Sequence, residues 1–152
     1  MRDECDPASF NAAVGPGTCI GDGDVTFGEF LDALADGGHE KWEFNNSRTE
    51  ADRAVNANNR GGETHTFTPV AQFGGGFVDV LNMGQDLIPE CVRLDANGNP
   101  ILDETGALQP AFSSFPTFVP PGGNSATMPL SKGTHKFQCC IHPWMQSTVV
   151  VR

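Results

Sequence analysis

Hydrophobic and polar residues alternate in short runs along most of the chain, and turn-forming residues separate these runs. A period of two places successive side chains on opposite faces of a strand. Runs of this kind occupy residues 41–44, 54–58, 64–70, 126–130, 134–139 and 148–152. Short strands with turns at this density predict an all-β fold, either a sandwich or a barrel.

One segment near the start of the chain has a helical period instead. Thr26 and Glu29 match a capping box, and apolar residues follow at helical spacing. Gly37 and Gly38 are expected to end this helix. Residues 1 to about 24 show no regular pattern and are predicted to be irregular. The sequence therefore predicts an N-terminal helical extension over residues 1–40.

Turn signals dominate residues 71–125, which we interpret as a long loop-rich insertion. Within it, the apolar runs 92–94 and 100–102 flank an Asp-Ala-Asn-Gly-Asn sequence, which is typical of a hairpin turn. The 152 residues show no internal repeat and no linker. We therefore expect a single domain over residues 1–152.

The formal net charge of −10 restricts the class of partner. An acidic surface repels phosphate backbones, which argues against nucleic acid and favours a basic or mixed-charge protein partner. Solubility alone would also account for this charge. No apolar run approaches the roughly 18–20 residues of a transmembrane helix.

The cysteine count is odd: Cys5, Cys19, Cys91, Cys139 and Cys140. If one of them binds a metal, the other four can form two disulfides in three possible ways. Cys5 and Cys19 flank one short segment, which favours that pair and leaves Cys91 with Cys140. Two disulfides would indicate an oxidising compartment, whereas four free thiols would indicate the cytosol. We expect a periplasmic or extracellular protein whose export signal is not in this chain.

The richest chemistry lies in the loop between the last two predicted strands. Cys139, His142 and Met145 follow one another in the spacing Cys-x-x-His-x-x-Met. A thiolate, imidazole nitrogens and a weakly bound thioether together form a blue-copper site. Such a site needs a second imidazole, and His65, at the start of a predicted strand, is the best candidate. The sequence therefore predicts one copper ion bound by these four residues.

Neighbouring residues offer rival ligands. His135 lies four residues before Cys139 on the same strand, which places it about 13 Å away. His39 follows the glycines that end the helix and is expected to be solvated. Cys140 is adjacent to Cys139, and alternation along a strand turns the two side chains to opposite faces. Cys140 is therefore expected to face away from the metal.

Two segments resemble parts of calcium-binding loops. Residues 21–30 match the second half of an EF-hand loop, but the first and third ligand positions would be Thr18 and Ile20. Residues 95–99 carry alternating oxygen donors without a closing glutamate. Helix capping at the first segment and a hairpin turn at the second are the favoured interpretations.

The loop and its approach resemble the cupredoxin family, in particular its plastocyanin- and amicyanin-like branch. The approach matches the family's Gly-Thr-x-x-Phe-x-Cys pattern from Gly133 to Cys139, and Val55-x-x-Asn58 followed by His65 is similar to the family's first-histidine strand. The resemblance covers about residues 41–70 and 125–152. It implies a Greek-key β-sandwich with one type 1 copper ion.

The resemblance also carries functional expectations. The family often has Asn after the first histidine, where this chain has Thr66. Gln138 stands where copper oxidases have a histidine that binds a second copper centre, so we expect no enzymatic activity. The resemblance implies a monomeric one-electron carrier that reacts with a redox partner protein through an exposed His142. The alternative is a module that sequesters or delivers copper.

Overall fold

The computed structural model describes residues 1–45, 48–51, 53–111 and 117–152. Strands outnumber helices in the regular secondary structure of these residues, which confirms the predicted all-β class. The strands are β1 (Arg48–Ala51), β2 (Ala54–Val55), β3 (His65–Thr66), β4 (Thr68–Val70), β5 (Phe118–Val119), β6 (Met128–Pro129), β7 (Gly133–Gln138) and β8 (Gln146–Val151). The helices are α1 (Pro7–Ala13), α2 (Phe27–Leu34) and the single 3-10 turn η1 (Asp79–Leu81).

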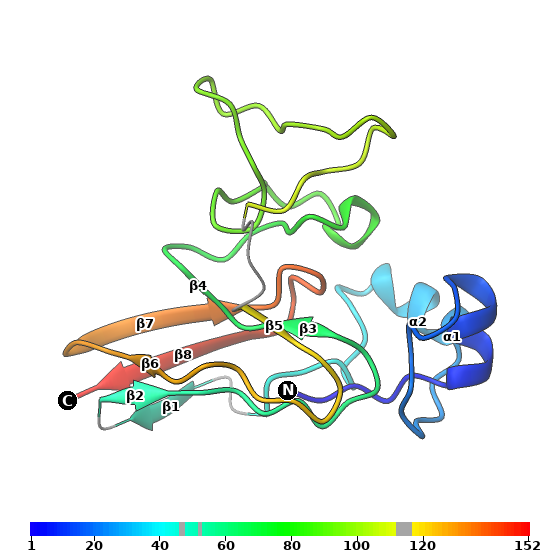
Figure 1. The fold of residues 1–152 in the computed structure, drawn as a ribbon, viewed down its shortest axis with the longest axis horizontal. Helices are drawn as coiled ribbons and strands as arrows, with labels where there is room; N and C mark the ends of the chain where they lie inside the picture. The colour runs from blue at the N-terminus through cyan, green and yellow to red at the C-terminus, as the bar shows by residue number, and fades with distance from the viewer. Residues whose placement is uncertain (46–47, 52, 112–116) are drawn as a thin grey trace.

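Four strands form the largest sheet, in the order β1-β8-β7-β4. β7 and β8 make the expected antiparallel hairpin, β4 pairs antiparallel with β7, and β1 runs parallel to β8. Two further antiparallel pairs, β2 with β6 and β3 with β5, complete the strand pairing among the described residues. In Figure 1 the hairpin and the β2 and β6 strands lie at one end of the molecule, and α1 and α2 lie at the other.

One apolar core joins the four-stranded sheet to the two strand pairs. Phe137 of β7 stacks on Phe67, with ring centroids 4.4 Å apart and planes within 4°. Val149 of β8 and Val119 of β5 are buried in the same cluster. This core anchors the ends of β3 and β7, from which the candidate ligands project. The division of the chain into a single domain stays a prediction.

The N-terminal extension contains two helices rather than the single one expected. α2 begins at the predicted capping box, in which Thr26 and Glu29 bond each other's backbone N–H groups. The prediction that residues 1–24 are irregular is wrong, because α1 begins at Pro7 with the Asp6 side chain accepting from two backbone N–H groups. Asp followed by Pro is an N-cap signal that can be identified directly in the sequence.

The strand expected at residues 41–44 is also absent, and only an isolated bridge joins Glu43 to Arg2. The apolar side chains there serve the core instead, since Trp42 and Phe44 are buried. Among the described residues, the backbone pairing of this segment is limited to the two hydrogen bonds that Glu43 exchanges with Arg2. The alternating pattern therefore predicted the burial of Trp42 and Phe44 correctly, but it did not predict a strand correctly.

Residues 71–111 of the insertion form the irregular lobe seen above the sheet in Figure 1, whereas β5, near its end, pairs with β3 in the body of the protein. The expected hairpin is present: Leu94 pairs with Pro100, and the Asp95 carboxylate accepts backbone N–H groups of Asn97 and Asn99. Asp95 therefore caps its own turn, which confirms the hairpin interpretation over a calcium loop. A small second core lies beneath this lobe and includes Cys91 and Cys140.

Candidate metal centre

Two histidines and one cysteine meet in the interior of the protein. The Nδ1 atoms of His65 and His142 lie 3.2 Å apart, and Sγ of Cys139 lies 3.8 Å from the first and 3.9 Å from the second. All three side chains are buried. Three of the four residues proposed from the sequence therefore place their donor atoms close enough together to contact one metal ion.

The local folding of the β7–β8 hairpin creates half of this arrangement. β7 ends at Gln138, and the loop that follows carries Cys139, His142 and Met145. The Cys139 N–H donates to the Met145 carbonyl at 3.0 Å, and the Met145 N–H donates to the His142 carbonyl at 3.0 Å. Met145 is itself buried in the main core. Two backbone hydrogen bonds therefore close the loop and fix the spacing of its donor residues.

His65 comes from the other side of the site. It lies in β3, where it pairs with Val119 of β5 and is fully buried. Its neighbour Thr66 binds the cysteine loop directly: the Thr66 N–H donates to Cys139 Sγ at 3.3 Å, and the Thr66 hydroxyl accepts the Cys140 N–H at 2.7 Å. Thr66 thus supports the loop with its hydroxyl at the position where the family often has Asn.

The separations of the three donor atoms match those expected around one ion. Zinc, a first-row neighbour of copper, binds imidazole nitrogen at about 2.0 Å and thiolate sulfur at about 2.3 Å, which places ligands roughly 3–4 Å from one another. A soft thiolate with two imidazoles is the donor set of a blue-copper centre. The residues present therefore fit a copper ion.

The surroundings of Cys139 favour its thiolate form. Burial on its own raises the pKa of the thiol, but the contacts with His142 and His65 outweigh burial and bring the pKa well below its usual value. The backbone N–H groups of Thr66 and His142 also point at the sulfur, at 3.3 and 3.5 Å. Because metals bind the thiolate, this environment prepares the residue as a ligand.

Cys140 faces away from the donor atoms, as strand alternation predicted. It forms a disulfide with Cys91, and Cys5 forms a second disulfide with Cys19. Both pairings are those favoured from the sequence, and Cys139 is the cysteine without a disulfide partner among the described residues. The Cys91–Cys140 bond therefore joins the insertion to the residue next to the candidate thiolate ligand.

The backbone of the insertion also covers the side of the site on which Cys140 lies. The Gln138 side chain bonds both backbone groups of Gly74, at 3.1 and 2.8 Å, and the Phe77 N–H donates to the Cys140 carbonyl at 3.0 Å. A β-carbon at Gly76 would collide with that carbonyl, so only glycine permits this approach. Gln138 thus anchors the insertion where copper oxidases carry a further metal ligand.

The expectation of an exposed His142 is wrong. Only 2% of this residue is exposed, and Pro143 beside it is fully buried. The ring of Phe30 from α2 meets the His142 ring edge-on at 6.1 Å, and Trp144 covers it at 5.5 Å. The helical extension, which the sequence did not connect with the metal site, therefore covers the imidazole.

Sequence reasoning missed a carboxylate that touches the site. Asp3 accepts a hydrogen bond from His65 Nε2 at 2.8 Å, and both side chains are fully buried. Burial on its own raises the pKa of Asp3, but hydrogen bonds from His65, Gly62 and Glu63 lower it below its ordinary value. Asp3 lies 62 positions from His65, so no local pattern could have revealed the pair.

A second carboxylate, that of Glu63, lies near the imidazole of His142. Its Oε2 is 3.7 Å from His142 Nε2 and accepts the indole N–H of Trp42 at 2.5 Å. Burial is the main influence and raises the pKa of Glu63, although the His142 charge and the Trp42 hydrogen bond act against it. Each histidine therefore has Nδ1 directed toward the shared point and Nε2 directed toward a carboxylate.

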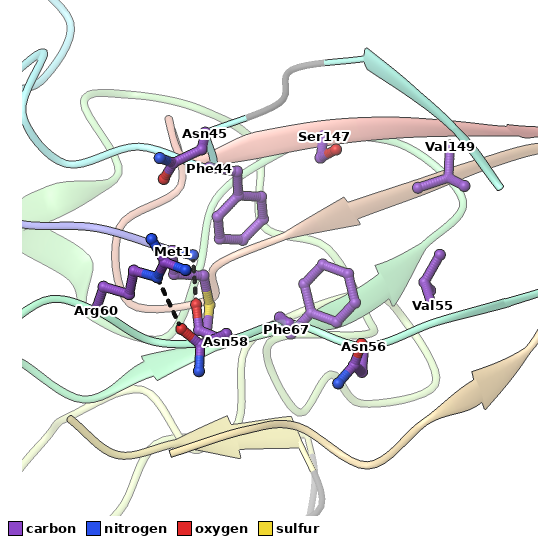
Figure 2. A pocket seen from close by; sticks show the side chains of 11 residues that line it. Met1, Phe44, Asn45, Val55, Asn56, Asn58, Arg60, Phe67, Ser147 and Val149 are labelled. Atoms are coloured by element: carbon purple, nitrogen blue, oxygen red, sulfur yellow. Dashed lines mark hydrogen bonds between the residues drawn. The ribbon is translucent and has the colours of Figure 1, made fainter. Parts of the chain in front are cut away.

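The remaining histidines lie outside the metal centre. His135 Nε2 forms a hydrogen bond with the Ser131 carbonyl at 2.8 Å. His39 was expected to be solvated, but it is half-buried against Trp42. A surface pocket of about 350 Å³ lies between Phe44, Phe67 and Val149, and Figure 2 shows that none of the candidate ligands lines it. The pocket and the metal centre are thus separate features.

Comparisons with known proteins find a similarity among solved structures. No protein-family model and no curated protein matches the sequence. Among solved structures, the chain is similar to a purple cupredoxin from Nitrosopumilus maritimus, with 18% identity, 89% of this chain and 95% of that chain covered, and a TM-score of 0.35. No described helix has the length and apolar character needed to cross a membrane.

Proposed function

We propose that this protein is a type 1 copper protein that carries single electrons between redox partners. His65, Cys139 and His142 would hold the ion, and Met145 would supply a weak thioether ligand. The observation that supports this proposal most strongly is the convergence of two Nδ1 atoms and one thiolate within 3.2–3.9 Å in the protein interior. Bound copper would supply a one-electron couple between Cu(I) and Cu(II).

The chain itself would supply rigidity and exclusion of water. Two backbone hydrogen bonds close the ligand loop, and Thr66 supports it from β3. The Asp3 carboxylate accepts a hydrogen bond from His65 Nε2, and the Glu63 carboxylate lies 3.7 Å from His142 Nε2. Donor atoms fixed in this way rearrange little when the charge of the ion changes. Fast electron exchange is the function that such an arrangement serves best.

Copper delivery is supported less well. A delivery site must release its ion to a partner, whereas His65 and Cys139 are fully buried here and His142 lies beneath α2. The two disulfides favour an oxidising compartment, the periplasm or the exterior. The net charge of −10 favours a basic or mixed-charge redox partner, and we expect a monomer.

Adding Cu(II) to the metal-free protein is expected to give an intense blue or green colour at one ion per chain. The colour arises from charge transfer between the Cys139 thiolate and copper. Ascorbate, which leaves disulfides intact, should bleach it with one electron per copper, and oxidation should restore it. Visible absorption and EPR spectra record the result.

A colourless complex with an ordinary tetragonal EPR signal would rule out the type 1 assignment. The carrier role has its own control, in which the reduced protein is mixed with a Cu(I) chelator. Copper should stay with the protein through many redox cycles. Release of the ion on mixing would favour the delivery function over electron transfer.

Replacing Met145 with leucine is expected to preserve copper binding and colour while raising the reduction potential. An axial thioether stabilises Cu(II) weakly, and its removal favours Cu(I). Because Met145 is buried and leucine has a similar volume, unfolding free energy should fall by less than about 1.5 kcal/mol. Redox titration and denaturant unfolding measure the two effects, and complete loss of copper would show that Met145 is an essential ligand.

A further inference from the structure

Asp3 is held against His65 by contacts on several sides. Its oxygens accept the backbone N–H groups of Gly62 and Glu63 at 2.9 and 3.1 Å, in addition to His65 Nε2 at 2.8 Å. A β-carbon at Gly61 would collide with the carboxylate. Glycine at position 61 therefore leaves the space that this carboxylate occupies.

The backbone around Asp3 is fixed as firmly as its side chain. Arg2 and Glu43 exchange two backbone hydrogen bonds, each 3.0 Å long, and the Arg60 N–H donates to the Met1 carbonyl at 3.0 Å. Figure 2 shows Met1 lying beside Asn58 and Arg60 in this segment. The carboxylate thus occupies one position relative to β3 and cannot swing away without breaking several backbone contacts.

A buried carboxylate in this position has two physical effects on an imidazole ligand. When the carboxylate accepts a hydrogen bond from the Nε2–H group, it fixes the orientation of the ring and leaves Nδ1 free to bind a metal. Its negative charge also acts through an environment that screens it far less than water does. Such a charge stabilises the oxidised, more positive ion relative to the reduced ion. The Glu63–His142 contact is longer, at 3.7 Å, and so constrains its ring less.

We propose that Asp3 is a positioning residue of the copper centre, which directs Nδ1 of His65 toward the ion and lowers its reduction potential. This inference rests on the function proposed above. The N-terminal segment is accordingly part of the metal centre, although it contributes no ligand.

The decisive variant is Asp3→Asn, with Asp32→Asn as its control. Asp32 lies on α2 and is exposed, so its replacement removes the same charge at the surface. Asp3→Asn should increase the ratio of Cu(I) to Cu(II) affinity about tenfold, which for one electron is about 59 mV. Asp32→Asn should leave the potential unchanged. Redox titration of both copper-loaded variants measures the shift.

An Asp3→Asn protein that loses stability but keeps the wild-type potential would overturn the proposal, because Asp3 would then be structural only. A second measurement uses the metal-free wild-type protein and so does not depend on the variant folding. The His65 Nε2 proton should exchange slowly with water and be visible by NMR. Its absence would also overturn the proposal.

These outcomes are distinct from failure of the proposed function. A wild-type protein that gives no thiolate charge-transfer band with copper would refute the type 1 assignment, whatever the NMR result. A coloured wild-type protein whose potential does not respond to Asp3→Asn would refute only the role of Asp3.

Discussion

Replacing Cys139 with serine is expected to abolish the colour of the copper-loaded protein completely. The visible band requires a thiolate bound to copper, and Cys139 is the cysteine outside a disulfide among the described residues. Replacing Cys91 and Cys140 together with serine should keep the colour. That double variant should instead lower the free energy of unfolding by about 2–4 kcal/mol, the usual contribution of a disulfide. Visible spectra and denaturant unfolding distinguish the two results.

The double replacement avoids leaving a reactive thiol beside the metal centre. Its matched control is the pair Cys5→Ser and Cys19→Ser, which removes the other disulfide and should also retain the colour. A colourless Cys91→Ser/Cys140→Ser protein would show that the ligand assignment and the role of the disulfide are wrong together. A coloured Cys139→Ser protein would contradict the ligand assignment alone.

The second large effect is expected at Trp42, beneath the helical extension that covers His142. Its ring stacks on Phe10 at 5.7 Å and meets Phe30 at 4.9 Å, and only 1% of the residue is exposed. Trp42→Ala should lower the free energy of unfolding by about 3–5 kcal/mol, because it leaves a large cavity in the aromatic core. Chemical denaturation of the metal-free protein measures this loss.

Trp42→Phe separates packing from hydrogen bonding. It keeps most of the aromatic contact but deprives Glu63 of its indole donor, so we expect a loss of about 1–3 kcal/mol. Val14→Ala, at an exposed position of the same extension, should change stability by less than about 0.5 kcal/mol. Equal losses for Trp42→Ala and Val14→Ala would show that the extension does not pack on the core.

The candidate ligand loop could be proposed from the sequence because its chemistry is local. Cys139, His142 and Met145 lie within seven residues, and their spacing alone indicates the donor set. The disulfides could also be anticipated, since the short loop between Cys5 and Cys19 left Cys91 and Cys140 as partners. His65 was identified by its place at the start of a strand.

The environment of the ligands could not be predicted in the same way. Asp3 and Trp42 meet the site through contacts with residues 62 and 21 positions away, and no periodic pattern encodes such pairs. The exposure of His142 was inferred from the family resemblance, which does not extend to residues 1–40. α1 is a different case, because Asp6 and Pro7 form a start signal that the irregular assignment overlooked.

The pairing of distant segments at the metal centre also determines when the site can form during folding. Cys139 is 74 positions from His65, and β1 pairs with β8 residues that lie 100 positions later, as Arg48 with Thr148. Contacts this distant in sequence carry a high loop-closure cost and form slowly. During synthesis, His65 emerges from the ribosome long before Cys139 does. The proposed copper site would therefore be complete only after β7 and β8 have docked, so we expect metal loading to follow folding rather than to initiate it.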